Sequence, residues 1–168
     1  MYALRVSTAT NTALVERFYA AFAALDGAAM QACYREDASF TDPVFTLQGR
    51  AQIGGMWRML CGATREKGRD VWKLELGDFS ADALSGRAHW EAHYRFSATG
   101  KLVHNIVDAQ FVFRDGLIER HADHFDFWRW SRQALGVSGT LLGWSPWLRN
   151  QVRARAAGNL AAFMAKPR

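Results

Sequence analysis

Residues 102–128 read LVHNIVDAQFVFRDGLIERHADHFDFW. Apolar and polar side chains alternate in both halves, which is the period of a strand with one buried face. The two halves are separated by Arg114-Asp115-Gly116, a typical turn sequence. The same alternation occurs earlier in VWKLELGDF (71–79) and GRAHWEAHYRF (86–96). The sequence therefore predicts an antiparallel meander of four strands, over 71–79, 86–96, 102–113 and 117–128.

Helical spacing dominates the chain before this meander. Apolar residues over 12–25 recur every three or four positions, and Asn11 or Thr12 is the expected cap. A shorter helix is predicted over 28–37 and a third over 50–64, although the Gly54-Gly55 pair weakens the third pattern. Helices followed by a meander indicate an α+β fold with a curved sheet and helices on its concave side.

Two further segments lie outside these helices and the meander. ASFTDPVF (38–45) predicts a short strand and a turn at Asp42-Pro43, because the residue before proline avoids helical backbone. Residues 131–146 are rich in glycine, and 147–165 have an amphipathic helical pattern with arginines on the polar face. We expect one domain over 1–130 and a C-terminal helical extension over 131–168.

Charge is distributed unevenly along the 168 residues. The net charge is +5, yet residues 128–168 contain seven basic and no acidic side chains, which leaves 14 basic against 16 acidic residues in the rest of the chain. The basic tail is most simply a solvated helix face; the alternatives are contact with phosphates or with an anionic membrane surface. Nucleic-acid reading is not expected, because no recognition module accompanies the tail.

Hydropathy and cysteine content indicate a globular intracellular protein. Because no run of eighteen apolar residues occurs, a spanning helix is not expected. The N-terminus lacks the pattern of a secretory signal. Cys33 and Cys61 are predicted to be buried thiols, not a disulfide, so we expect a cytoplasmic location.

Two stretches carry a family resemblance: YREDASFTDPVF (34–45) and RDGLIERHADHFD (114–126). With the order of the helices, residues 11–130 resemble the nuclear transport factor 2-like superfamily, in the branch that holds ketosteroid isomerases, SnoaL-like polyketide cyclases and limonene epoxide hydrolases. The resemblance implies a cone-like, curved antiparallel (mixed) sheet wrapped around three N-terminal helices, with a mostly apolar pocket. Function varies within such a fold and must be argued from the pocket.

Alternation projected onto that cone predicts which side chains face the pocket. On the last strand we expect His121, Asp123, Phe125 and Phe127 inside, and Arg120, Ala122, His124 and Asp126 outside. The other inward positions are Trp90, Ala92, Tyr94, Asn105, Val107, Ala109 and Phe111. His89, Glu91 and His93 share the convex face; they are a chemically suitable zinc set, but Arg87 and Arg95 project from the same face, so we expect no metal.

The resemblance also indicates catalytic residues. Asp42 corresponds to the general base of ketosteroid isomerases, and a carboxylate at the rim of a dry cavity is expected to have a raised pKa. The oxyanion hole of those enzymes is not matched, since Phe18 stands at the tyrosine position, with Tyr19 adjacent, and Ala109 at that of the acid. Asp123 corresponds to one aspartate of the epoxide hydrolases, but Ala92 and Tyr94 replace their arginine and second aspartate.

We therefore expect a cofactor-independent acid–base enzyme acting on a small hydrophobic, oxygen-bearing molecule. Asp42 is the predicted base, and Asp123, oriented by His121, is the predicted acid or orienting group. Predicted substrate-binding residues are Tyr94, Asn105, Trp90, Trp57, Phe18, Tyr19, Phe111 and Phe125. We also expect a homodimer through the convex sheet. The alternatives are epoxide hydrolysis, a non-catalytic ligand-binding or dimerisation module, and a membrane-surface protein using the tail with Trp128, Trp130, Trp144 and Trp147.

Overall fold

A computed structural model describes the backbone of residues 2–167 and the side chains of residues 8–167. The elements follow one another as α1 (Tyr2–Ala23), α2 (Gly27–Gln31), β1 (Tyr34–Thr41), β2 (Thr46–Gln48), α3 (Arg50–Lys67), β3 (Lys73–Ala81), β4 (Ser85–Arg95), β5 (Leu102–Arg114), β6 (Leu117–His124), α4 (Phe127–Leu135), α5 (Val137–Leu142) and α6 (Pro146–Met164).

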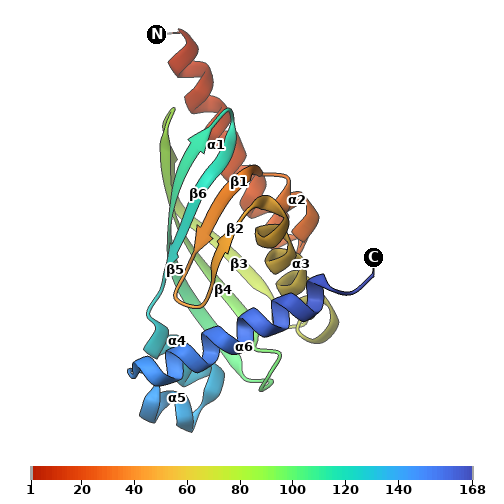
Figure 1. The fold of residues 1–168 in the computed structure, drawn as a ribbon. Helices are drawn as coiled ribbons and strands as arrows, with labels where there is room; N and C mark the ends of the chain where they lie inside the picture. The colour runs from red at the N-terminus through yellow and green to blue at the C-terminus, as the bar shows by residue number, and fades with distance from the viewer. Residues whose placement is uncertain (1, 168) are drawn as a thin grey trace.

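The six strands form one curved sheet in the order β2-β1-β6-β5-β4-β3. β1 runs parallel to β6, and the other neighbours are antiparallel, so the sheet is mixed. It is not closed, since β2 and β3 are its edges. Figure 1 shows the sheet wrapping around the helices, with α6 lying across its open side. The predicted α+β architecture, with a meander of β3 to β6, is confirmed.

The core lies between the concave face of this sheet and helices α1 and α3. Phe18 of α1 and Trp57 of α3 are buried against Phe40 of β1 and Phe111 of β5. Each such side chain contributes about 1.5–3 kcal/mol through burial of its apolar surface. Leu160 of α6 joins the same core, so the C-terminal helix is held by packing.

The beginning of α1 differs from the prediction, because the helix starts at Tyr2 and Asn11 is not its cap. The Asn11 side chain instead donates hydrogen bonds to the carbonyls of Asp82 (2.9 Å) and Ala83 (3.2 Å), in the turn between β3 and β4. Asparagine is typical of caps, but here its amide satisfies a tertiary contact.

Two other boundaries were predicted wrongly. The second helix ends at Gln31, not at residue 37, because Tyr34 pairs with Ile118 of β6 and already belongs to β1. The last strand ends at His124, not at residue 128. Asp126 does not continue the outward face: its carboxylate accepts a hydrogen bond from Arg129 N (3.0 Å) and caps α4, whose first residue is Phe127.

Close approaches of a side chain and of a backbone carbonyl explain two glycine positions. α3 continues through Gly54-Gly55, and a Cβ atom at Gly54 would lie 2.1 Å from the Gln31 side chain of α2. In the glycine-rich segment, a Cβ atom at Gly139 would lie 1.8 Å from the Ser131 carbonyl oxygen. Glycine therefore allows α5 to cross α4, and the two short helices turn the chain back toward α6.

The helix α6 is tethered to the turn at Asp42-Pro43. The Arg153 guanidinium Nε donates a hydrogen bond to the Pro43 carbonyl (2.8 Å). Among the residues that the structure describes, no helix is both long enough and apolar enough to cross a membrane.

Candidate active site

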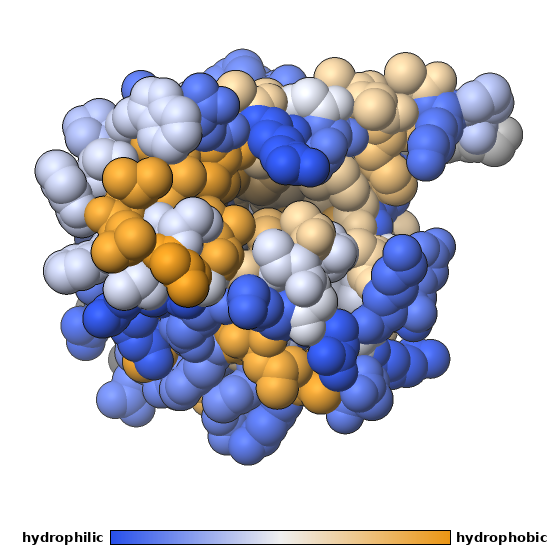
Figure 2. All heavy atoms as spheres, turned by 90° about the horizontal axis from the view of Figure 1, so that it is seen from below, coloured by the Kyte–Doolittle hydropathy of each residue, from blue (hydrophilic) through white to orange (hydrophobic). Residues whose placement is uncertain are grey.

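A cavity of about 530 Å³ lies between the concave face of the sheet and helices α3, α4 and α6. Its wall is mostly apolar, with Trp57, Trp90, Val107, Phe125 and Ala156 among the lining residues. A volume of this size suits a small organic molecule. Figure 2 shows the molecule hollowed on the face seen from below.

Asp42 reaches this cavity from the turn that follows β1. Its Oδ1 atom accepts hydrogen bonds from the backbone N–H groups of Val44 (2.7 Å) and Phe45 (2.6 Å), which fixes the carboxyl group in the turn. Burial raises the pKa of Asp42 to about 7, and the negative charge of Asp123 adds to the rise, while the two backbone donors oppose it. At neutral pH this carboxyl group is therefore divided between its acid and its base form.

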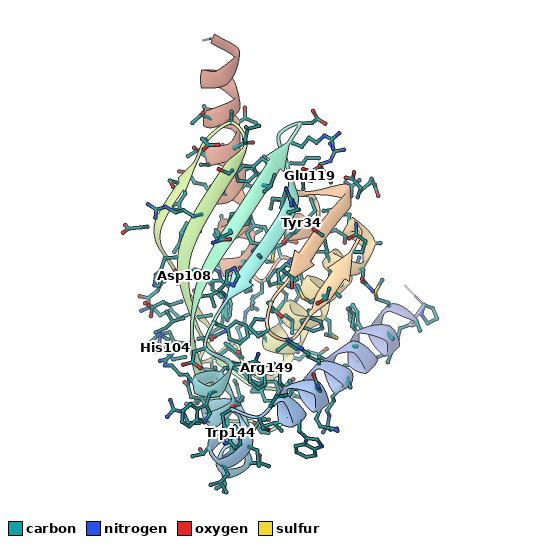
Figure 3. The ribbon with its side chains drawn as sticks, turned by 60° about the vertical axis from the view of Figure 1, so that its left-hand side comes forward. Tyr34, His104, Asp108, Glu119, Trp144 and Arg149 are labelled. Atoms are coloured by element: carbon teal, nitrogen blue, oxygen red, sulfur yellow. The ribbon has the colours of Figure 1, made fainter. Side chains whose placement is uncertain are left out.

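Asp123 faces the same cavity from β6 and is buried. Its Oδ1 atom lies 2.8 Å from His121 Nε2, and His121 Nδ1 lies 2.7 Å from the Tyr34 hydroxyl. The same hydroxyl accepts a hydrogen bond from the Trp57 indole N–H (3.0 Å). Figure 3 shows Tyr34 on β1, beside the β6 strand that carries the rest of this buried hydrogen-bond chain.

The Trp57 indole at one end of this hydrogen-bond chain fixes which of its atoms donate and which accept. An indole N–H can only donate, so the Tyr34 oxygen accepts it and the Tyr34 proton is free for His121 Nδ1. With Nδ1 accepting from Tyr34, the Nε2–H group of His121 donates a hydrogen bond to Asp123. Every donor finds an acceptor, one Asp123 oxygen is held in place, and its other oxygen is free for the cavity.

Tyr94 supplies a hydroxyl to the cavity wall. Its oxygen accepts a hydrogen bond from the indole N–H of Trp130 in α4 (2.8 Å), so the hydroxyl proton can be donated to another acceptor. Burial raises the pKa of Tyr94 to about 12, and the charge of Asp42 contributes to the rise. Tyr94 therefore stays protonated at physiological pH and can donate to an oxygen atom in the cavity.

Two buried donors have no hydrogen-bond partner among the described residues. They are the hydroxyl of Tyr19 and the indole N–H of Trp90. An unpaired buried donor costs about 1–3 kcal/mol. Trp90 lines the cavity, so an oxygen atom of a bound molecule could satisfy its N–H group.

Most of the residues predicted to form the site come together around one cavity. Its lining includes Asp42, Asp123, Trp57, Trp90, Tyr94, Asn105 and Phe125. The strand register aligns several of them, since Ala92 pairs with Asn105 and Ala109 with Asp123.

Four predicted residues lie outside the lining. His121 stands behind Asp123 and is buried, with its ring against Phe18 and Phe111, so it can orient Asp123 but does not face the cavity. Phe18, Tyr19 and Phe111 belong to the buried core and are not among the residues that line the cavity.

Tyr34 and Trp130 contribute to the site in ways that the sequence patterns do not predict. Tyr34 was placed in a helix, although Tyr34, Ala38 and Phe40 share strand spacing that would have moved it to β1. Trp130 became a partner of Tyr94 only because α4 turns the chain back toward β4. No local pattern indicates that contact.

Three histidines on the outer face of the sheet, His89, His93 and His104, lie beside carboxylates. His89 Nδ1 lies 2.8 Å from Asp108 Oδ1, and His104 Nε2 lies 2.5 Å from Glu91 Oε2; His104 and Asp108 are labelled in Figure 3. His93 stacks on His104 with ring centroids 4.1 Å apart. Within the described part of the chain, no group of three or more His, Cys, Asp or Glu side chains is arranged to hold a metal ion.

Solved structures with the same fold include proteins of several kinds. A candidate polyketide cyclase from Xanthomonas campestris pv. campestris is 23% identical, with a TM-score of 0.61, and the match covers 76% of this chain and 98% of that one. An LEH-like epoxide hydrolase from M. tuberculosis is 18% identical, with a TM-score of 0.62 and coverage of 80% and 97%. A protein of ketosteroid isomerase-like fold from Catenulispora acidiphila, in complex with trimethylamine, is 15% identical, with a TM-score of 0.61 and coverage of 79% and 97%.

These likenesses concern the fold, because all three identities are below 25%. The search of curated proteins gave no match. The model of the SnoaL-like domain matches residues 15–121, from α1 to His121, the hydrogen-bond partner of Asp123. The resemblance seen in the sequence is thereby confirmed, and the chain belongs to the SnoaL-like domain family.

Proposed function

We propose that the protein is a cofactor-independent acid–base enzyme, which transfers a proton within a small hydrophobic, oxygen-bearing molecule during an isomerisation or a cyclisation. One observation carries the proposal: Asp42, with a pKa of about 7, faces an apolar cavity of about 530 Å³. A general base is most effective when its pKa lies near the working pH. The fold of the candidate polyketide cyclase and of the epoxide hydrolase supports an enzymatic role.

In the proposed reaction, Asp42 removes a proton from a carbon atom next to a carbonyl group. The C–H electron pair moves into the carbonyl system, and negative charge develops on its oxygen. Tyr94 donates its hydroxyl proton as a hydrogen bond to that oxygen, since its own oxygen already accepts from Trp130. The protonated Asp42 then returns the proton to another carbon or to the oxygen, so that no external reactant is needed.

Asp123 has a different role in this proposal. His121 holds one of its oxygens, and the free oxygen accepts a hydrogen bond from a substrate hydroxyl or from water. The trio Trp57, Tyr34 and His121 acts through Asp123 and is a positioning chain. Because fixed geometry lowers the entropy lost in reaching the transition state, loosening this chain should reduce turnover more than binding.

The test is deuterium exchange of a panel of small hydrophobic ketones in D₂O, followed by NMR. The wild type should catalyse exchange at positions next to the carbonyl group, with a rate that rises with pH around 7. Asp42→Asn should lower the rate by about 10²–10⁴-fold, the usual contribution of a general base. Asp108→Asn, on the exposed outer face, is the matched control and should keep the wild-type rate.

Full exchange activity in Asp42→Asn would reject the assignment of the base. Hydration of epoxides is the second reaction for the same cavity, with Asp123 holding the water. A panel of hydrophobic epoxides in H₂¹⁸O distinguishes the two: label in a diol product, without exchange in the ketones, would favour hydration.

A further inference from the structure

Helices α4, α5 and α6 expose a group of apolar side chains at one end of the molecule. Six of the ten large hydrophobic side chains that are exposed in the described residues lie between positions 128 and 147. We define them as the α4–α6 patch: Trp128, Val137, Leu141, Leu142, Trp144 and Trp147. Figure 2 shows apolar side chains gathered on this face beside the hollow, and Figure 3 shows Trp144 at the same end. A contiguous exposed apolar surface marks an interaction site.

Hydrogen bonds to backbone carbonyls fix two of the exposed indole rings, those of Trp128 and Trp144. The Trp128 indole N–H donates to the Thr140 carbonyl (3.2 Å), and the Trp144 indole N–H donates to the Leu141 carbonyl (2.9 Å). Both rings are nevertheless exposed, Trp128 at 43% and Trp144 at 67%. The patch is therefore a fixed surface, with its apolar groups already directed outward.

Positive charge predominates around this surface, and the exposed Asp126 that caps α4 is the nearest acidic side chain in the sequence. Residues 127–168 contain no Asp or Glu, and the arginines of α4 and α6 form no ion pair with any acidic side chain in the described part of the chain. The guanidinium of Arg132 lies over the Trp128 ring, 5.0 Å from its centroid. The guanidinium of Arg149, labelled in Figure 3, lies 5.2 Å from the centroid of Phe127. A partner complementary to this surface would present both apolar and anionic groups.

We propose that the α4–α6 patch docks the protein on the surface of an anionic lipid bilayer. The tryptophans and leucines would enter the boundary between headgroups and acyl chains, and the arginines would lie against anionic headgroups. A nucleic acid fits less well, because exposed Val137, Leu141 and Leu142 offer nothing to a phosphate backbone. The helices that carry the patch also line the cavity, through Trp130 and Leu135 of α4 and Val152 of α6. Docking would therefore bring the cavity close to the phase in which apolar substrates are concentrated.

The experiment is flotation of the full-length protein with vesicles of phosphatidylcholine, with or without phosphatidylglycerol. The wild type should bind the anionic vesicles and bind phosphatidylcholine alone only weakly. Leu141→Ser combined with Trp144→Ser should lower the partition coefficient by about tenfold or more, because two apolar side chains no longer enter the interface. Arg132→Gln should lower it by about fivefold on anionic vesicles, since one basic side chain is lost.

Matched substitutions at distant exposed positions are the controls. Leu84→Ser, in the turn between β3 and β4, and Arg120→Gln, on the outer face of β6, should leave binding unchanged. The altered side chains are exposed, and thermal unfolding of each variant checks that the fold is retained. Equal binding to both kinds of vesicle, patch variants that float like the controls, or wild type that stays in the unbound fraction would overturn the proposal. Binding of a DNA duplex in place of the anionic vesicles would also overturn the proposal, in favour of a nucleic-acid partner.

Discussion

Tyr34→Phe removes a single oxygen atom from the buried chain that joins Trp57 to Asp123. In the wild type that oxygen accepts from the Trp57 indole and contacts His121 Nδ1 at 2.7 Å, and Tyr34 itself is 0% exposed. Phenylalanine fills the same space but leaves both nitrogen atoms without a partner. A buried polar group left unpaired costs about 1–3 kcal/mol, so two of them should lower the free energy of unfolding by about 2–6 kcal/mol.

Tyr19→Phe is the matched control for this substitution. Tyr19 is also buried, at 2% exposure, but its hydroxyl has no partner in the described structure. Removing that hydroxyl leaves nothing unpaired, so the variant should be as stable as the wild type or slightly more stable.

Urea unfolding, followed by tryptophan fluorescence and by circular dichroism, measures both free energies under identical conditions. The expected result is a large loss for Tyr34→Phe and none for Tyr19→Phe. Equal losses, or a larger loss for Tyr19→Phe, would refute the assignment of hydrogen bonds in this core.

Two further predictions concern the pH dependence and the glycine contacts. Because the pKa of Asp42 is raised from 3.8 to about 7, its neutral form stabilises the fold below pH 4, and this stability is lost as the pH rises toward 7. The stability of Asp42→Asn relative to wild type should therefore increase by about 2–4 kcal/mol between pH 4 and 8, measured by urea unfolding; a constant difference would contradict it. Gly139→Ala should destabilise by about 2 kcal/mol or more because its Cβ would overlap the Ser131 carbonyl, while Gly158→Ala, with no atom within 4 Å, should stabilise by about 0.5–1 kcal/mol in thermal unfolding. Equal effects of the two substitutions would show that the backbone around Gly139 shifts to accommodate the Cβ atom with little loss of stability.

The meander and the inward carboxylate of β6 could be predicted because a strand with one buried face has a period of two. The same rule placed Asp123, Tyr94 and Asn105 at the cavity. The rule of strand alternation failed where the local sequence favours one structure and a contact with a residue far away in the chain imposes another. Tyr34 comes three positions after the end of α2, and its membership of β1 depends on pairing with β6, 84 positions later in the chain. His121 was expected to face the cavity. It is instead buried against Tyr34 and Phe111, and strand alternation alone does not predict this packing.

The C-terminal region shows the same limit. Its amphipathic helix was predicted from spacing, but the cap at Asp126 that ends the alternation and starts α4 was read as part of a strand. Asp42 was predicted from its place before Pro43, by resemblance. The backbone donors that hold it and the neighbouring charge of Asp123 are tertiary features, which one sequence does not reveal.

The most direct measurement is the titration of Asp42 by NMR, with aspartate labelled with ¹³C at the carboxyl carbon. The signal that disappears in Asp42→Asn identifies the residue, and its chemical shift against pH gives the midpoint. A midpoint of about 7 is predicted, with a smaller value in Asp123→Asn because one negative charge is removed. A midpoint near 3.8, unchanged by that substitution, would mean that the carboxyl group is solvated and apart from Asp123, and the proposed proton transfer would lose its base.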